Sequence, residues 1–186
     1  MNAFSVTTAD TASTQTPTRR TTTAPRTTDT PGHRDDGDDP FFRRYGTRRL
    51  PRGLREEAAG MDWQLFLTIY SPEARLAVNH VTSTRRDNCT FRFGISATRR
   101  SKTHAPREEF HEIDASGPAA ACSELLADAG RAVEILDFHQ YPLFEATVTF
   151  VRGSWKNRTA WAMGFGPDPQ TSVVHALTCA AERIHG

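Results

Sequence analysis

Two short groups of residues have the types and spacing that could do chemistry. His175 and Cys179 are four residues apart in a segment with helical periodicity, so an imidazole could activate a thiolate on one helix face. No third group that would orient the imidazole is evident, so we expect ordinary packing for this pair. Ser116-Gly117-Pro118 is typical of a helix start, where backbone N–H groups without helical partners can bind an anion. A plain N-cap followed by proline is the alternative interpretation.

Metal chemistry has little support in the sequence. The acidic run Asp35, Asp36, Asp38 and Asp39 could hold a hard cation, but such a run in a Pro- and Gly-flanked tail is usually solvated. The three cysteines lie far apart and form no CxxC pair, which argues against a zinc site and against a disulfide framework. We therefore expect neither a metal nor a cofactor.

Charge and hydropathy argue against nucleic-acid and membrane partners. The net charge is only +1, and no stretch approaches the roughly 20 apolar residues that cross a bilayer. The N-terminal residues lack an apolar run that could form a signal-peptide core, so we expect a cytoplasmic protein. Arginine pairs, which could contact the phosphates of a nucleic acid, begin at positions 19, 43, 48, 85 and 99. The strands, however, lack the aromatic residues interleaved with basic ones on an exposed face that are typical of RNA-binding sheets.

The chain divides by composition into a tail, a helical linker and a folded domain. Residues 1–40 are rich in Thr with scattered Pro, Arg and Asp, and we expect them to be disordered. Residues 41–72 form the helical linker, in which Trp63, Phe66, Leu67 and Tyr70 follow the helical spacing. The pattern predicts a helix from Asp62 to Tyr70, because Asp62 can cap it and Ser71-Pro72 ends it. Residues 73–186 form the domain.

The domain is predicted to contain one pattern of elements twice. Alternation of apolar and polar residues predicts a strand over 89–97, a weaker one from Leu76, and a third over 109–115. Gly117-Pro118 then opens a short helix that Gly130 closes. Strands over 132–138, 146–152 and 158–165 follow, and a helix runs over 169–184.

The repeated pattern predicts an α+β fold class. Two βββα units of about 50 residues, each with one apolar sheet face and one amphipathic helix, can cover each other as a two-layer sheet-and-helix domain. A short helix and the disordered tail precede them.

The order of these segments resembles a known family. Residues 115–130, 133–138, 145–148 and 159–164 are similar to the C-terminal regulatory (allosteric dimerisation) domain of 2-isopropylmalate synthases. The similarity covers about seventy residues well and the preceding seventy more loosely. This resemblance implies a homodimer that binds a small aliphatic amino acid, leucine in the family, between subunits, and so a role in branched-chain amino-acid (leucine) biosynthesis. It implies these effector-binding residues: Ser116, Gly117, Ala119, Ala120, Ile135 and Phe138.

The implied ligand site agrees with the physical chemistry of a helix start. Free amides at Gly117, Ala119 and Ala120, together with the positive end of the helix dipole, can hold a free amino acid's carboxylate. Ile135 and Phe138 match the family positions that contact the apolar side chain. Two residues depart from the family, which usually has glycine at the position of Ala115 and tyrosine at that of Phe138. A structural dimerisation partner that binds no ligand is therefore the alternative.

The family's catalytic part is a metal-dependent barrel of about 250 residues, for which 186 residues leave no room. None of the seven histidines forms the HxH pair that the family's barrel uses as metal ligands. We therefore expect no catalysis by this chain itself. Its expected partner is a separate barrel-containing acyl-transfer synthase.

Overall fold

The computed structural model describes residues 39–186, which belong to one compact unit. The tail predicted over residues 1–40 lies outside the described residues, except for its last two positions. Asp39 and Pro40 already belong to the first helix, as its N-cap and first residue.

Three short helices precede the sheets: α1 (Pro40–Tyr45), α2 (Arg52–Glu57) and α3 (Trp63–Tyr70). The prediction for α3 is confirmed, because the Asp62 carboxylate accepts a hydrogen bond from the Leu65 amide at 2.8 Å. The prediction that Asp39 is solvated is wrong. Its buried carboxylate accepts hydrogen bonds from the amides of Phe41, Phe42 and Leu50 at 2.8–3.0 Å, and so joins α1 to the following segment.

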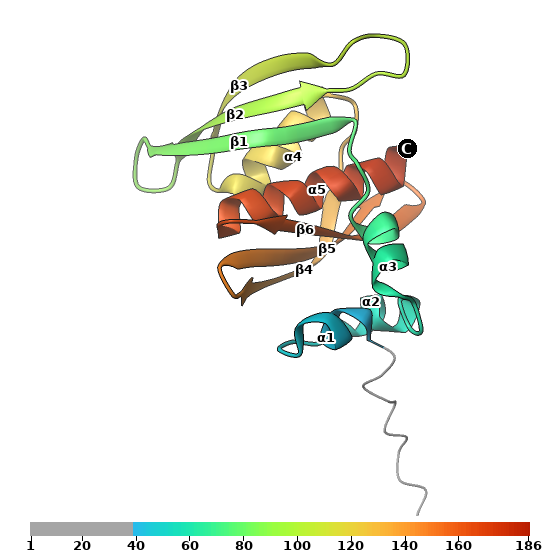
Figure 1. Cartoon of the computed structure of the whole chain (residues 1–186). Helices are drawn as coiled ribbons and strands as arrows, with labels where there is room; N and C mark the ends of the chain where they lie inside the picture. The colour runs from blue at the N-terminus through green and yellow to red at the C-terminus, as the bar shows by residue number, and fades with distance from the viewer. Residues whose placement is uncertain (1–38) are drawn as a thin grey trace, which may run out of the picture. The chain divides into compact units, whose positions relative to one another are not determined.

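Two βββα units follow, as the repeat predicts (Figure 1). The first contains β1 (Leu76–Arg85), β2 (Phe91–Arg99), β3 (Arg107–Ala115) and α4 (Pro118–Asp128). The second contains β4 (Glu134–Leu143), β5 (Ala146–Trp155), β6 (Arg158–Gly166) and α5 (Pro169–His185). Each set of strands forms an antiparallel sheet in sequence order. We call β1–β3 the first sheet and β4–β6 the second sheet.

The strand bounds differ from the predicted ones mainly at the turns. Cys89 lies outside β2 because the Asp87 carboxylate accepts hydrogen bonds from the amides of Cys89 and Thr90, both at 2.9 Å, in the β1–β2 turn. β4 extends to Leu143, beyond its predicted end. Both differences come from turn and edge positions, where hydrophobic alternation carries little information.

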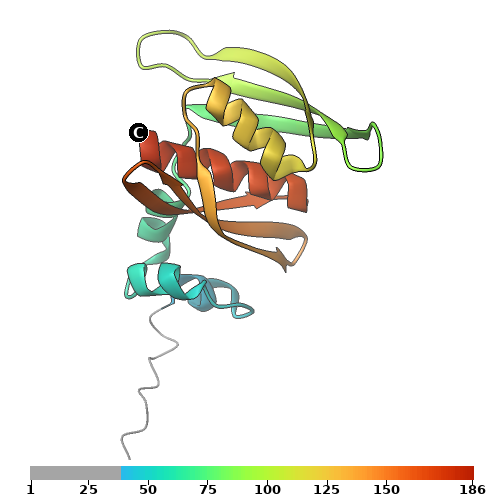
Figure 2. The ribbon, with the colours of Figure 1, turned by 180° about the vertical axis from the view of Figure 1, so that it is seen from behind.

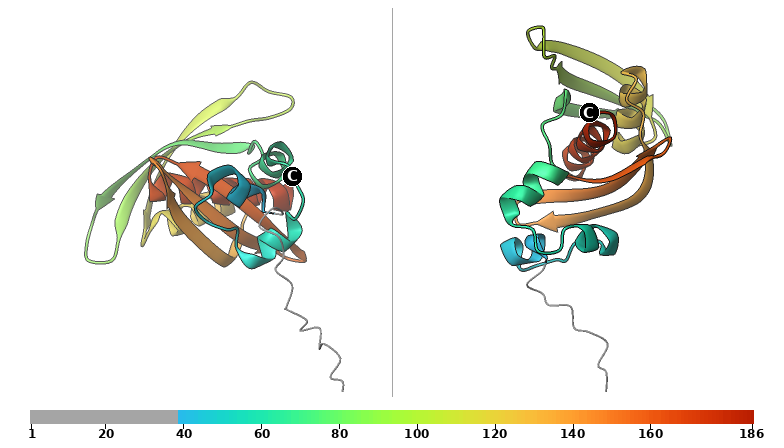
Figure 3. Two further views of the ribbon diagram at one scale, coloured as in Figure 1. Left: turned by 60° about the horizontal axis from the view of Figure 1, so that its bottom comes forward. Right: turned by 90° about the vertical axis from the view of Figure 1, so that its right-hand side faces the viewer.

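Helices α4 and α5 lie between the two sheets (Figures 1 and 3). Their side chains form one core with the facing sides of both sheets, and Phe93 and Ile95 of the first sheet and Val151 of the second are almost fully buried there. Figure 2 shows α4 beside α5 from behind. The two helices thus cover the inner faces of the sheets in both units.

The second sheet is buried on both faces, which differs from the prediction of one apolar face per sheet. Its outer face packs on α1–α3, where Phe150, Trp161 and Met163 meet Phe41 and Phe66 in a separate core. The sequence signal lies in β6, where residues 160–166 include no polar side chain, a pattern typical of strands covered on both sides.

Helix α5 lies unusually close to β6 because two glycines face it. A Cβ atom at Gly164 would lie 2.2 Å from the amide nitrogen of Ala176, and one at Gly166 would lie 2.5 Å from that of Ser172. Real Cβ atoms do not approach backbone atoms so closely, so only glycine permits this packing.

Candidate functional site

The start of α4 has no side-chain cap. Gly117 is the N-cap, with extended backbone angles, and Pro118 follows as the first helical residue. The Gly117 carbonyl accepts the first helical hydrogen bond, from the Ala121 amide at 3.0 Å. Within residues 39–186, the amides of Gly117, Ala119 and Ala120 donate no hydrogen bond to a turn, a cap or another chain segment. The structure thus shows an N-cap followed by proline, in which the cap residue is glycine and supplies no side chain to the free amides.

The corresponding helix start in the second unit holds a carboxylate. Asp168 is the N-cap of α5 and Pro169 follows it, just as Pro118 follows Gly117. The Asp168 carboxylate accepts hydrogen bonds from the amide and the hydroxyl group of Thr171, both at 2.8 Å. The bond from the Thr171 amide is the main reason that the pKa of Asp168 is lowered. The same fold position thus has a carboxylate in one unit and no acidic group in the other.

The first turn of α4 is accessible to a ligand. Apart from Gly117 and its two chain neighbours, no residue has an atom within 4 Å of the position that a Cβ at Gly117 would occupy. Ser116 and Ala120 are exposed, and Ala119 is half-buried. The structure therefore brings four of the predicted effector residues together at one open helix end.

The two remaining predicted residues lie on an open edge of the second sheet. Ile135 and Phe138 belong to β4, an edge strand, and their exposed fractions are 38% and 45%. They pair with Gly153 and Val151, which face α5, so both side chains lie on the helix side of the sheet. Ile135 follows the carboxyl end of α4, and eleven helical residues, about 16 Å, separate that end from Gly117.

Sequence reasoning missed Leu136, which adds to this apolar edge. It is 48% exposed and lies at an irregularity of the β4–β5 register between Ile135 and Asp137. Two adjacent apolar residues, Ile135 and Leu136, interrupt the alternation of the strand, and this is the signal that could have revealed a bulge. The reasoning also missed the Asp168 cap, although Asp-Pro is a typical helix start.

The departure at Ala115 does not strain the backbone. The only described residues other than glycine with positive φ are Phe144 and Lys156, so position 115 needs no glycine for its conformation. The methyl group of Ala115 packs against the core that contains α4 and α5. At position 138, where the family usually has tyrosine, Phe138 presents an exposed ring without a hydroxyl group.

The geometry does not favour His175 and Cys179 as a catalytic thiolate–imidazole pair. Both ring nitrogens of His175 face backbone carbonyl oxygens, Nδ1 that of Phe165 at 2.6 Å and Nε2 that of Val78 at 3.1 Å. The Cys179 thiol donates to the carbonyl of Pro72 at 3.4 Å, and burial raises its pKa to about 11. The thiol therefore stays protonated at neutral pH, and His175 joins α5 to β1 and β6.

Within residues 39–186, no group of three or more His, Cys, Asp or Glu side chains could hold a metal ion. In the same part of the chain, no helix is long and apolar enough to cross a bilayer. Comparisons of the chain with protein-family models and with curated proteins find no match.

Proposed function

We propose that this chain is a cytoplasmic regulatory and dimerisation module that binds a small aliphatic amino acid, leucine above all, and has no catalytic activity of its own. It acts in leucine biosynthesis by associating with a separate barrel-containing acyl-transfer synthase. The observation that carries the proposal is the contrast between the two helix starts. Asp168 fills the start of α5 with a carboxylate, and a ligand carboxylate would take the same place at Gly117.

The expected affinity is modest. A carboxylate at a helix start contributes about 0.3–2 kcal/mol, and burial of a leucine side chain contributes about 1.5–3 kcal/mol. The loss of translational and rotational freedom on association offsets part of this gain. We therefore expect binding in the millimolar to high micromolar range.

A second copy of the chain completes the proposed site. Ile135, Leu136 and Phe138 are exposed on an edge strand, and exposed apolar edges of this kind favour pairing with another chain. Within one chain, the length of α4 separates Ile135 from Gly117. A ligand that contacts both the helix start and the apolar edge would therefore take the two contacts from two different chains.

Titration calorimetry on the full chain tests ligand binding. We expect saturable heat with leucine, weaker heat with isoleucine and valine, and none with lysine, because a second charge has no partner in an apolar pocket. The absence of heat and of a thermal shift with all four amino acids at millimolar concentration would remove the sensor proposal.

Dimerisation is tested by a charge on the apolar edge. Phe138→Asp should weaken the dimer at least about tenfold, because a carboxylate without a partner would be buried in the interface. Phe110→Asp is the matched control, since Phe110 is 66% exposed but lies on β3 of the other sheet. Analytical ultracentrifugation should detect monomers for the first variant only. A dimer that survives Phe138→Asp but not Phe110→Asp would place the interface on the first sheet.

A structural dimerisation partner without ligand binding is the second candidate. Ala115 and Phe138 favour it, because both depart from the residues usual in the family that the sequence resembles. Co-purification with a synthase, combined with no response to any amino acid, would favour this candidate.

A further inference from the structure

A cavity of about 630 Å³ lies at the carboxyl ends of α4 and α5, away from the start of α4. Four separate segments line it: residues 75–76 at the start of β1, residues 99–103 between β2 and β3, residues 129–131 after α4, and His185. This volume is within the range of small-molecule sites in proteins.

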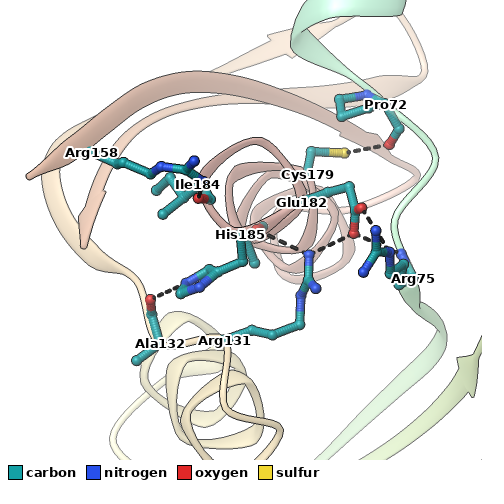
Figure 4. A network of polar contacts seen from close by, with 10 residues as sticks. Pro72, Arg75, Arg131, Ala132, Arg158, Cys179, Glu182, Ile184 and His185 are labelled. Atoms are coloured by element: carbon teal, nitrogen blue, oxygen red, sulfur yellow. Dashed lines mark hydrogen bonds and ion pairs between the residues drawn. The ribbon is translucent and has the colours of Figure 1, made fainter. Parts of the chain in front are cut away.

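The lining of the cavity is strongly basic. Five of the lining residues are arginine or lysine and none is acidic. Glu182 pairs with both Arg75 and Arg131, at 3.3 and 2.6 Å (Figure 4). Among the described residues, Lys102 has neither an ion-pair nor a hydrogen-bond partner.

Two further acids offset two of the other cations. Arg99 forms two hydrogen bonds with Glu109, at 2.9 and 3.0 Å, and Arg100 pairs with Glu73. Three acidic side chains therefore face five cationic ones. The remaining surplus of two positive charges matches the charge of a phosphate monoester dianion.

Two backbone carbonyls near the carboxyl end of α5, beside the cavity, have arginine donors. The carbonyl of Ala181 accepts a hydrogen bond from Arg131 at 3.2 Å. The carbonyl of Ile184 accepts one from Arg158 at 2.6 Å, and Figure 4 shows both of these residues. Both of these carbonyls therefore already accept a hydrogen bond from an arginine. The Arg131 side chain is also fixed, because it is only 14% exposed and Glu182 holds it.

We propose that this cavity binds a small molecule that carries a phosphate group. Arg131, which Glu182 holds, provides fixed positive charge. Arg75 pairs with the same carboxylate, and the exposed Lys102 adds an ammonium group to the lining. The hydroxyl groups of Ser101 and Thr103 line the same cavity and can donate to phosphate oxygens. The ligand of this cavity is a separate effector, because α4 separates it from the helix start at Gly117.

Pyrophosphate is a suitable probe for titration calorimetry with the full chain at low ionic strength. We expect saturable binding, tighter than that of citrate, which carries carboxylates only. Lys102→Gln should weaken binding about tenfold, the effect of one lost charge contact of about 1.4 kcal/mol. Lys156→Gln is the matched control, because it removes the same charge from the β5–β6 turn and should leave the affinity unchanged.

Three outcomes would overturn the proposal: no saturable binding of pyrophosphate, equal weakening by Lys102→Gln and Lys156→Gln, or tighter binding of citrate than of pyrophosphate. Affinity that rises with the length of an oligonucleotide would likewise overturn it in favour of a nucleic-acid surface. The amide signals of residues 101–103 in a nitrogen-15 spectrum should shift with pyrophosphate and provide an independent measurement.

Discussion

Replacing Gly117 with aspartate should abolish amino-acid binding while the fold and the dimer remain intact. The new side chain would cap α4 as Asp168 caps α5, and its charge would repel the carboxylate of the ligand. Two unit charges 4 Å apart repel by about 1 kcal/mol in water and by about 4 kcal/mol near a protein surface. This repulsion and the loss of the contact between the ligand carboxylate and the helix start should together lower the affinity for leucine at least about tenfold.

Calorimetry with leucine measures this loss, and two comparisons make it specific. Stability should change by no more than about 0.5 kcal/mol, because Gly and Asp are both favourable N-caps and Gly117 has free space around it. Ala127→Asp adds the same charge at an exposed position in the last turn of α4 and should keep the affinity of the parent chain. Unchanged leucine affinity in Gly117→Asp would show that the ligand binds elsewhere.

Gly164→Ala should lower the free energy of unfolding by at least about 3 kcal/mol. The added methyl group would lie 2.2 Å from the Ala176 amide nitrogen and 2.6 Å from the Ser172 carbonyl oxygen, so α5 would have to move away from β6. Overpacking of this kind costs about 1–3 kcal/mol in ordinary cores, and here the neighbours are rigid backbone atoms.

Denaturant unfolding measures this effect, and Gly117→Ala is its matched control. A Cβ at Gly117 meets no atom within 4 Å, so this variant should lose less than about 1 kcal/mol. Similar losses in the two variants would contradict the close packing of α5 on the second sheet.

The repeat could be predicted from the sequence because each element leaves a local pattern. Alternation revealed β2 through Phe91, Phe93 and Ile95, and Gly117-Pro118 marked the start of α4. These signals depend on neighbours along the chain, and tertiary contacts reinforce them. The predicted order of three strands and one helix, twice over, is confirmed.

Features that depend on distant segments could not be predicted in the same way. The buried carboxylate of Asp39 belongs to an acidic run that looks solvated, and one of its three amide donors, Leu50, lies eleven residues away. The burial of the second sheet on its outer face depends on the helices before β1, which the sequence places in a linker.

The two parts of the candidate site differ, for the same reason, in how far the sequence predicts their positions. Residues 116–120 are contiguous, so the sequence alone predicts that they share one helix start. The position of Ile135 and Phe138 relative to that start depends on the packing of α4 and, in our proposal, on a second chain. Four separate segments between Arg75 and His185 line the basic cavity, and no local sequence pattern predicts that they lie together.

The most direct test of ligand binding at the start of α4 is a leucine titration of the nitrogen-15-labelled chain followed by backbone amide shifts. The account predicts saturable shifts at Gly117, Ala119 and Ala120, while the Thr171 amide, which already donates to Asp168, keeps its position. Shifts confined to other residues, or no shift at Gly117 when calorimetry reports binding, would contradict it.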